Sequence, residues 1–237
     1  MFPTGCVAIM YPISFQNNHP LARSFIASVE RPDFPCVGAK SALGKGQMDI
    51  LVARDIASAW DDMRIMPALA ATVARYRADR ALFRTMIVLF EGPSGLTETE
   101  FERHLWARAQ SLSDKDEWLG YLPDPTVSSD PDDPHFSLSF AGEAFFVVGL
   151  HPQASRPARR FETPAMVFNL HDQFQVLREQ QRYEKLRSAI LTRDERLAGS
   201  ANPMLARHGE LSEARQYSGR AVDASWKCPF QRGASHG

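Results

Sequence analysis

The sequence predicts an α+β fold: a single domain in which helices flank a mixed β-sheet. Two β-branched runs separated by a helical segment occupy the first half of the chain, and two apolar runs joined by a short turn follow in the second. Of the 237 residues, 44% are hydrophobic and 23% charged, which is ordinary for a globular protein of one domain. Early strands separated by a helix, with a later hairpin, are typical of a mixed sheet. We therefore expect one domain over residues 1–237.

The first half of the chain supplies two strands and a helix. The runs "MDILVARD" (48–55) and "TMIVLFEG" (85–92) predict strands, because they are short and rich in β-branched residues. Between them, residues 56–83 are rich in Ala, Arg and Leu and predict helix. Pro67 lies inside that segment, and a proline in a helical pattern predicts either a break or a second start.

A capped helix and a long loop come next. Thr97 and Glu100 have the spacing of a capping box, and Phe101, Leu105 and Ala109 then recur at helical spacing, which predicts a helix over about 98–112. The segment "YLPDPTVSSDPDDPHFS" holds four prolines and four aspartates and predicts a long loop. Loops of that length in compact domains are usually functional or mobile.

The second half predicts a hairpin, another strand and a last helix. The runs "FSLSF" (136–140) and "AFFVVGL" (144–150) are joined by the turn residues "AGE", as in a β-hairpin. "AMVFNL" (165–170) predicts a further strand, and a helix follows over about 171–193. Its buried side is marked by Phe174, Leu177, Leu186 and Ile190. From residue 194 onwards there is little periodicity, and no further element is predicted.

Composition excludes several classes of function. The net charge of −1 argues against general binding to nucleic acids or membrane surfaces, which needs a broad basic excess. No apolar run reaches the roughly 18–20 residues of a membrane span, and the apolar start lacks the basic region of a signal peptide. Cys6, Cys36 and Cys228 are odd in number and widely spaced, which argues against a disulfide framework or a zinc cluster. We expect a cytoplasmic protein.

Familiar catalytic motifs are missing from the sequence. The segment "GAKSALGKGQ" (38–47) is rich in glycine and lysine, but it precedes a strand and matches neither the Walker nor the dinucleotide spacing. We interpret it as a flexible loop. HExxH, GxSxG and paired CxxC motifs do not occur, so the common hydrolase and metalloprotease hypotheses have no support.

The stretch "GLHPQASRPARRF" (149–161) is the strongest candidate site. His151, Arg156, Arg159 and Arg160 follow directly on an apolar strand. An imidazole nitrogen can bind haem iron axially, and guanidinium groups can pair with the propionates of haem. The alternative is a strand end whose arginines pair with surface acids, and a phosphorylated metabolite is a further ligand that such a cluster suits.

Two other residues could bind haem iron. Cys36 could supply a thiolate ligand, or it could be a small buried apolar residue. His171 also ends a strand, but with Asp172 it could instead form a hydrogen-bonded helix cap.

Seven short motifs, in this order, resemble the YqcI/YcgG family over about residues 31–230: "FPCVGAKSAL", "AFFVVGLHPQASRPARRF", "MVFNLHDQF", "LRSAILTRD", "ANPML", "SEARQYSGR" and "WKCPF". The family includes the guanitoxin-biosynthesis type of haem-dependent N-hydroxylase. The resemblance implies an enzyme with haem b that uses dioxygen to hydroxylate a guanidine or amine nitrogen of an arginine-like small molecule, with electrons from a reductase or ferredoxin.

Under this hypothesis His151 is the expected axial ligand, with His171 and Cys36 as alternatives, and Arg156, Arg159 and Arg160 are expected to hold the propionates. A cationic substrate needs an acidic partner, for which Glu213 and Asp172 are the candidates. A haem-binding sensor or carrier without catalysis is the competing hypothesis.

Overall fold

Five strands form one mixed sheet in the order β1-β2-β5-β4-β3, in a computed structural model that describes residues 14–206 and 209–231. β1 and β2 are parallel and the other neighbours antiparallel, because α3 carries the chain across between β1 and β2 while a tight turn joins β3 to β4. The strands are Met48–Asp55 (β1), Thr85–Gly92 (β2), Leu138–Phe140 (β3), Glu143–Leu150 (β4) and Ala165–Leu170 (β5). The α+β prediction is confirmed.

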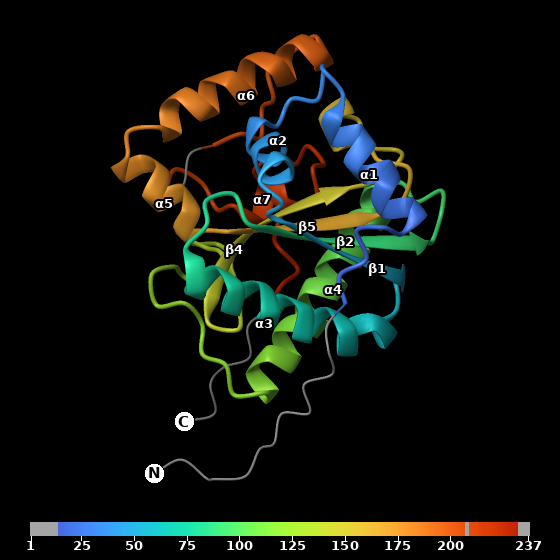
Figure 1. Cartoon of the computed structure of the whole chain (residues 1–237), viewed down its shortest axis with the longest axis vertical. Coiled ribbons are helices and arrows are strands. Elements are labelled where there is room, and N and C mark those ends of the chain that lie inside the picture. The colour runs from blue at the N-terminus through green and yellow to red at the C-terminus, as the bar shows by residue number, and fades with distance from the viewer. Residues whose placement is uncertain (1–13, 207–208, 232–237) are drawn as a thin grey trace.

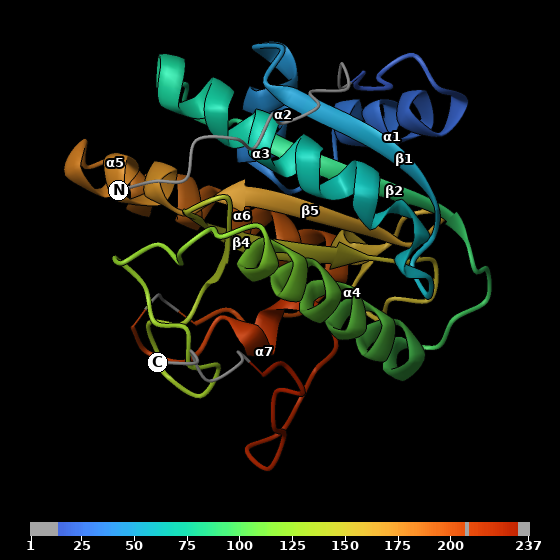
Figure 2. The same ribbon diagram turned by 90° about the horizontal axis from the view of Figure 1, so that it is seen from below.

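Helices cover both faces of this sheet (Figure 1). They are Pro20–Glu30 (α1), Val37–Gly44 (α2), Asp62–Asp79 (α3), Glu98–Trp118 (α4), Asp172–Glu179 (α5), Tyr183–Ala198 (α6) and Ala214–Tyr217 (α7), with 3₁₀ turns at Ala59–Asp61 (η1) and Pro157–Arg159 (η2). Figure 2 shows α3 and α4 on the near side of the sheet. None of the helices within residues 14–206 and 209–231 combines the length and apolar character needed to cross a bilayer.

The sheet face under α3 and α4 is tightly packed. Side chains of β4 that point to this face, such as Phe145 and Val147, are fully buried in one large apolar cluster. Gly149 lets α4 approach closely, since a Cβ atom there would lie only 2.6 Å from a methyl carbon of Leu105 and 2.7 Å from the ring of Phe101. This face is therefore a solid core.

The opposite face is covered less completely. α1 packs Phe25 and Val29 against Ile50 and Val52 on the β1 side. Farther along the sheet, toward β5 and β4, the alternate side chains on this face remain half-buried. They are Phe146, Val148, Val167 and Asn169.

The strands and the capped helix agree with the sequence prediction. In the hairpin, Ala141 and Gly142 both have positive φ (52° and 77°), the conformation of a two-residue turn whose twist matches the strands. Thr97 and Glu100 form the predicted capping box, and α4 extends to Trp118 because its apolar face continues past 112 to pack Leu112 in the core.

Four predictions about helices need correction. α3 begins at Asp62 and runs through Pro67 without a break. Pro67 has no backbone N–H, and the carbonyl that this N–H would reach belongs to Met63, which is 78% exposed. Residues 171–193 do not form the one helix predicted. They are divided between α5 and α6, because Gln181 takes a left-handed conformation (φ 57°) between the two helices. The interpretation of 38–47 as a loop is wrong, because most of it is α2. The tail, expected to be irregular, contains α7.

Candidate functional site

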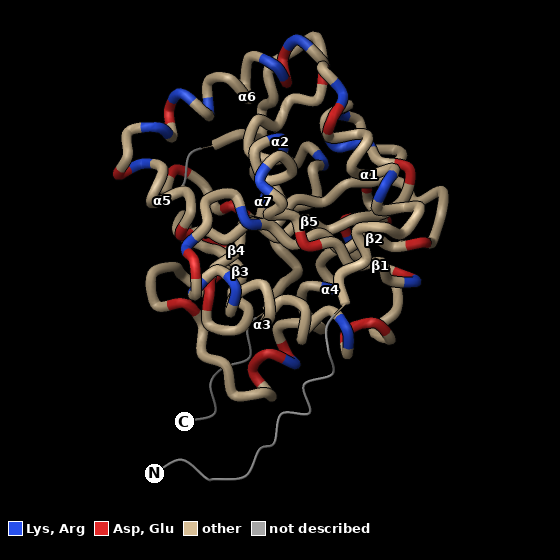
Figure 3. Tube along the Cα trace, viewed as in Figure 1, with Lys and Arg blue, Asp and Glu red and all other residues tan. Residues whose placement is uncertain are grey.

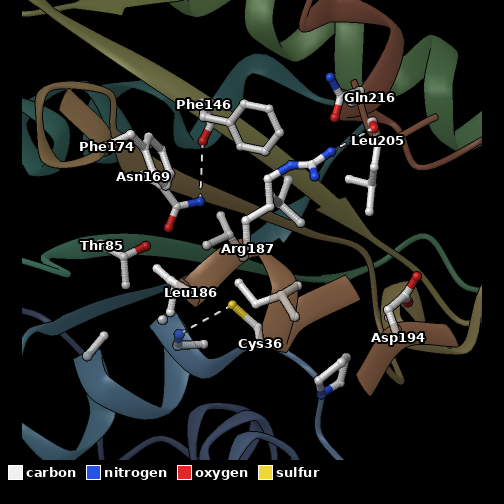
Figure 4. A pocket seen from close by; sticks show the side chains of 18 of the residues that line it. Cys36, Thr85, Phe146, Asn169, Phe174, Leu186, Arg187, Asp194, Leu205 and Gln216 are labelled. Carbon is white, nitrogen blue, oxygen red and sulfur yellow. Dashed lines mark hydrogen bonds between the residues drawn. The ribbon is translucent and has the colours of Figure 1, made fainter. Parts of the chain in front are cut away.

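A cavity of about 320 Å³ lies between the half-covered sheet face and α6. Its volume is at the lower end of the range for small-molecule sites, about 300–1,000 Å³. Phe146, Val148 and Val167 form the sheet side, and α2 closes one flank. Figure 4 shows these elements surrounding the cavity. The lining is predominantly apolar with a few polar groups, as in a site for an organic ligand.

The roof of the cavity is the apolar side of α5 and α6. All four residues predicted to mark the buried side of this region line the cavity: Phe174, Leu177, Leu186 and Ile190. Leu186 and Ile190 remain half-buried because they face the cavity instead of a packed core. The helical spacing of these apolar residues therefore identified the side of α5 and α6 that faces the cavity.

Cys36 lies in the wall of this cavity, at the N-cap of α2. Its Sγ accepts a hydrogen bond from the backbone N–H of Ala39 at 3.3 Å. Burial raises the pKa of the Cys36 thiol, while the N–H groups of Ala39 and Gly38 and the charge of Arg159 act in the opposite direction. Cys36 is half-buried and lines the cavity, and an iron ligand needs to face the site in this way.

His151 lies elsewhere. Leu150 lines the cavity, and His151, the next residue, turns to the other side of the sheet, where its ring stacks on Phe101 of α4 with centroids 4.4 Å apart. The side chain is 1% exposed, and burial lowers the pKa of His151 against the raising effect of Glu98. The structure therefore separates His151 from the cavity.

The three arginines expected to hold propionates bind the protein itself. Arg156 pairs with Asp194 at 2.5 Å and donates to the carbonyls of Ser200 and Ala201. Arg156 and Arg159 line the cavity, and Arg160 does not.

Within the part of the chain that the structure describes, the other two guanidinium groups donate to backbone carbonyls. Arg159 donates to the carbonyls of Gly149, Gln216 and Tyr217. Arg160 donates to the carbonyls of Ala154 and Ser155. The bonds of Arg159 tie the stretch 149–161 to α7, and those of Arg160 close the stretch on itself. Their donor groups are used by backbone acceptors, and not by the surface acids that the strand-end alternative expects.

Glu213 and His171 form a buried pair at one end of the cavity. Glu213 lines the cavity, and its Oε1 lies 3.5 Å from Nε2 of His171, while its Oε2 accepts from Ser137 at 2.6 Å. Tyr217 also donates to Glu213, at 3.4 Å, and the nearby carboxylate and burial together hold the pKa of Tyr217 well above its usual range. His171 itself does not line the cavity.

Asp172 lies outside the cavity. It accepts hydrogen bonds from Tyr76 at 2.5 Å and Arg80 at 2.7 Å, and these bonds join the start of α5 to the end of α3. Burial and the bond to Asp172 raise the pKa of Tyr76. Asp172 thus has the position of a structural residue.

The structure adds polar residues that the sequence did not single out. Asn169, Gln173, Arg187 and Gln216 line the cavity together with Glu213. Arg187 had a sequence signal, because it lies between Leu186 and Ile190 on the apolar side of a helix, where a charged residue is unexpected.

Within residues 14–206 and 209–231, no group of three or more His, Cys, Asp or Glu side chains could hold a metal ion. Cys228 is the second described cysteine, with burial raising its pKa to about 12, and Cys6 lies outside the described residues. Figure 3 shows basic and acidic residues interspersed along the chain, in keeping with the near-neutral net charge.

These features define an α+β protein with an apolar cavity between a mixed sheet and a helical roof. The chain belongs to the YqcI/YcgG family, whose model matches residues 24–231. No curated protein and no solved structure matched the chain in the corresponding searches.

Proposed function

We propose that this chain is a haem-dependent N-hydroxylase that oxidises a guanidine or amine nitrogen of an arginine-like small molecule, as in the guanitoxin-biosynthesis type of the YqcI/YcgG family. The observation that carries the proposal is the position of Cys36. Among the three candidate axial ligands, Cys36 is the one whose side chain lines the cavity. We therefore replace the expectation of His151 with Cys36 as the proposed ligand.

The residues around Cys36 have the chemistry that haem requires. Phe146 and Phe174 give the flat apolar walls that suit a porphyrin, and the sulfur is a soft ligand for iron. The N–H group of Ala39 points at Sγ, and hydrogen bonds to a ligating sulfur tune the potential of the iron. The start of α2 also favours negative charge on the sulfur.

Haem bound there would activate dioxygen, for which cysteine thiolate ligation is especially suited. The overall reaction takes two electrons from a reductase or ferredoxin and two protons. One oxygen atom forms the N–OH group and the other leaves as water.

This chain's own residues orient the substrate and exclude water. The apolar roof of α5 and α6 shields the reacting nitrogen from solvent. A cationic guanidine or amine needs a carboxylate, and Glu213 is the acid proposed for this role because it reaches the cavity wall while Ser137 and Tyr217 fix its orientation. We also propose that the protein is located in the cytoplasm.

The test is to express the full chain with a haem supply and then record its absorption spectrum and its turnover. We expect about one haem per chain, and dioxygen consumption with formation of an N-hydroxylated product when L-arginine or a related guanidine is added with a reductase. A haem protein that consumes no dioxygen with any guanidine or amine would be the sensor or carrier. A chain that takes up no haem would refute the proposal.

Replacing Glu213 by glutamine should weaken binding of a guanidinium substrate by roughly 10- to 150-fold, since a charge-assisted hydrogen bond contributes about 1.5–3 kcal/mol. Haem content should stay unchanged. Substrate-induced changes in the haem spectrum would measure the affinity. Glu210→Gln, in the same segment but exposed, is the control and should bind as the wild type does. Equal affinity in both variants would remove Glu213 from substrate recognition.

A further inference from the structure

Arg187 is the cavity arginine with the fewest protein partners among the described residues. It projects from α6 toward Phe146 and Gln216, as Figure 4 shows. Among the described residues it makes one hydrogen bond, from Nη2 to the carbonyl of Leu205 at 3.4 Å, which is long for an N–H···O bond. A guanidinium group has five N–H donors. Most of the donor capacity of Arg187 is therefore not used by the part of the chain that the structure describes.

The other cavity arginines differ. Arg156 has a carboxylate partner in Asp194, and Arg159 binds three backbone carbonyls. Arg178 stacks on Tyr183, with its guanidinium carbon 4.6 Å from the ring centroid. Each of them has an evident structural role, so Arg187 is the cation that is left for a ligand.

Arg187 is half-buried on the apolar side of α6. Its neighbours on the same side of the helix are the apolar residues that roof the cavity, Tyr183, Leu186, Ile190 and Leu191. A charged group held against apolar surface loses hydration, and the loss is offset only by hydrogen bonds or by an opposite charge. A residue kept for solubility would instead lie on the outer side of α6, as Arg193 does.

We propose that Arg187 is the carboxylate-binding residue of the cavity. Its planar fork suits two parallel bonds to a carboxylate. Under the proposed function, on which this inference rests for its ligands, two carboxylates could reach it: a haem propionate and the carboxylate of an amino-acid substrate. Both present the same chemistry, and paired probes distinguish them.

The experiment compares wild type, Arg187→Gln and Arg187→Lys with Arg193→Gln, an exposed position on the same helix with the same change of charge. Hemin and hemin dimethyl ester, which lacks free carboxylates, are titrated by absorbance. L-arginine and agmatine, which lacks the carboxylate, are titrated by calorimetry. Thermal unfolding of each variant shows that it is folded.

If Arg187 holds a propionate, Arg187→Gln weakens hemin binding roughly 10- to 150-fold and leaves the dimethyl ester unaffected. If Arg187 holds the substrate, Arg187→Gln leaves hemin binding unchanged. Binding of L-arginine weakens by the same factor, while binding of agmatine does not weaken. Arg187→Lys should retain part of the affinity, because the charge remains and the fork is lost. Arg193→Gln should match the wild type with all four probes.

The inference is overturned if Arg187→Gln binds hemin and L-arginine as tightly as the wild type. It is also overturned if the variant's affinity for the dimethyl ester and agmatine falls as much as its affinity for hemin and L-arginine. Failure of the proposed function has a different signature: the wild-type protein binds no hemin. The L-arginine titration then decides alone, and a wild type that binds neither carboxylate probe refutes the role of Arg187.

Discussion

Replacing Cys36 by serine is expected, under the proposed function, to abolish a thiolate-type haem spectrum. Wild-type protein should form a ferrous carbon monoxide complex that absorbs near the P450 position, because the proposed ligand is a cysteine thiolate. Serine keeps an oxygen at the N-cap of α2, where the Cys36 sulfur now accepts from Ala39, and serine is a preferred N-cap residue. The variant thus removes the iron ligand while the helix start is preserved. Absorption spectra of the carbon monoxide complexes measure the effect.

Two matched variants make the result specific. His151→Ala should keep the thiolate-type band, since the His151 ring packs on Phe101 away from the cavity. Cys228→Ser should also keep this band, because Cys228 does not line the cavity. A globin-type carbon monoxide spectrum in the wild type, with loss of haem in His151→Ala, would show that His151 is the ligand.

The second large effect is on stability. Asp62→Ala should lower the free energy of unfolding by about 3–5 kcal/mol, the cost of leaving one buried charge unpaired. Asp62 is fully buried between α3 and α4, where it pairs with Arg108 and Lys115 and accepts from Ser111 at 2.7 Å. Domains are stable by only about 5–15 kcal/mol, so this loss would be a large part of the total. Urea unfolding at neutral pH measures it.

The double variant Asp62→Ala with Arg108→Met tests the cause. Removing both charges leaves no lone charge in the core, so most of the lost stability should return. Asp114→Ala, an exposed change on α4, should alter stability by no more than about 0.5 kcal/mol. A single variant as stable as the wild type, or a double variant no better than the single one, would contradict this account of the pair.

Stability and haem binding should separate cleanly in these variants. The Asp62 cluster lies on the packed face of the sheet, whereas Cys36 and Arg187 lie on the open face. Purified Asp62→Ala that remains folded should therefore retain the wild-type spectrum, and Cys36→Ser should unfold close to the wild-type urea concentration.

Local patterns determined much of the secondary structure. The strands at 48–55, 85–92 and 165–170 and the capping box at Thr97 follow from residue type and spacing, which act over a few residues. α2 escaped prediction because three glycines resemble a loop, and its capping residue is a cysteine, an uncommon cap. The join at Gln181 depends on a single left-handed residue that has no sequence signature.

The candidate site could be predicted only in part. The sequence singled out Cys36, Glu213 and the arginines as residues suited to a ligand, because their chemistry is a property of the side chain alone. It favoured His151 over Cys36 as the iron ligand, since a strand end is equally close to both faces of a sheet. Side chains alternate along a strand, so the step from Leu150 to His151 exchanges the cavity for the packed face.

By itself, then, the sequence determined the types of element, the apolar sides of the helices and the resemblance to the YqcI/YcgG family. Only the tertiary structure decided which residues meet. Arg159 donates to the carbonyl of Tyr217, which lies 58 positions away in the chain. Arg156 pairs with Asp194 of α6. Such contacts join segments distant in the chain, and they depend on which helix covers which face of the sheet. Local residue patterns carry no record of that choice, because it is set by packing of the whole molecule.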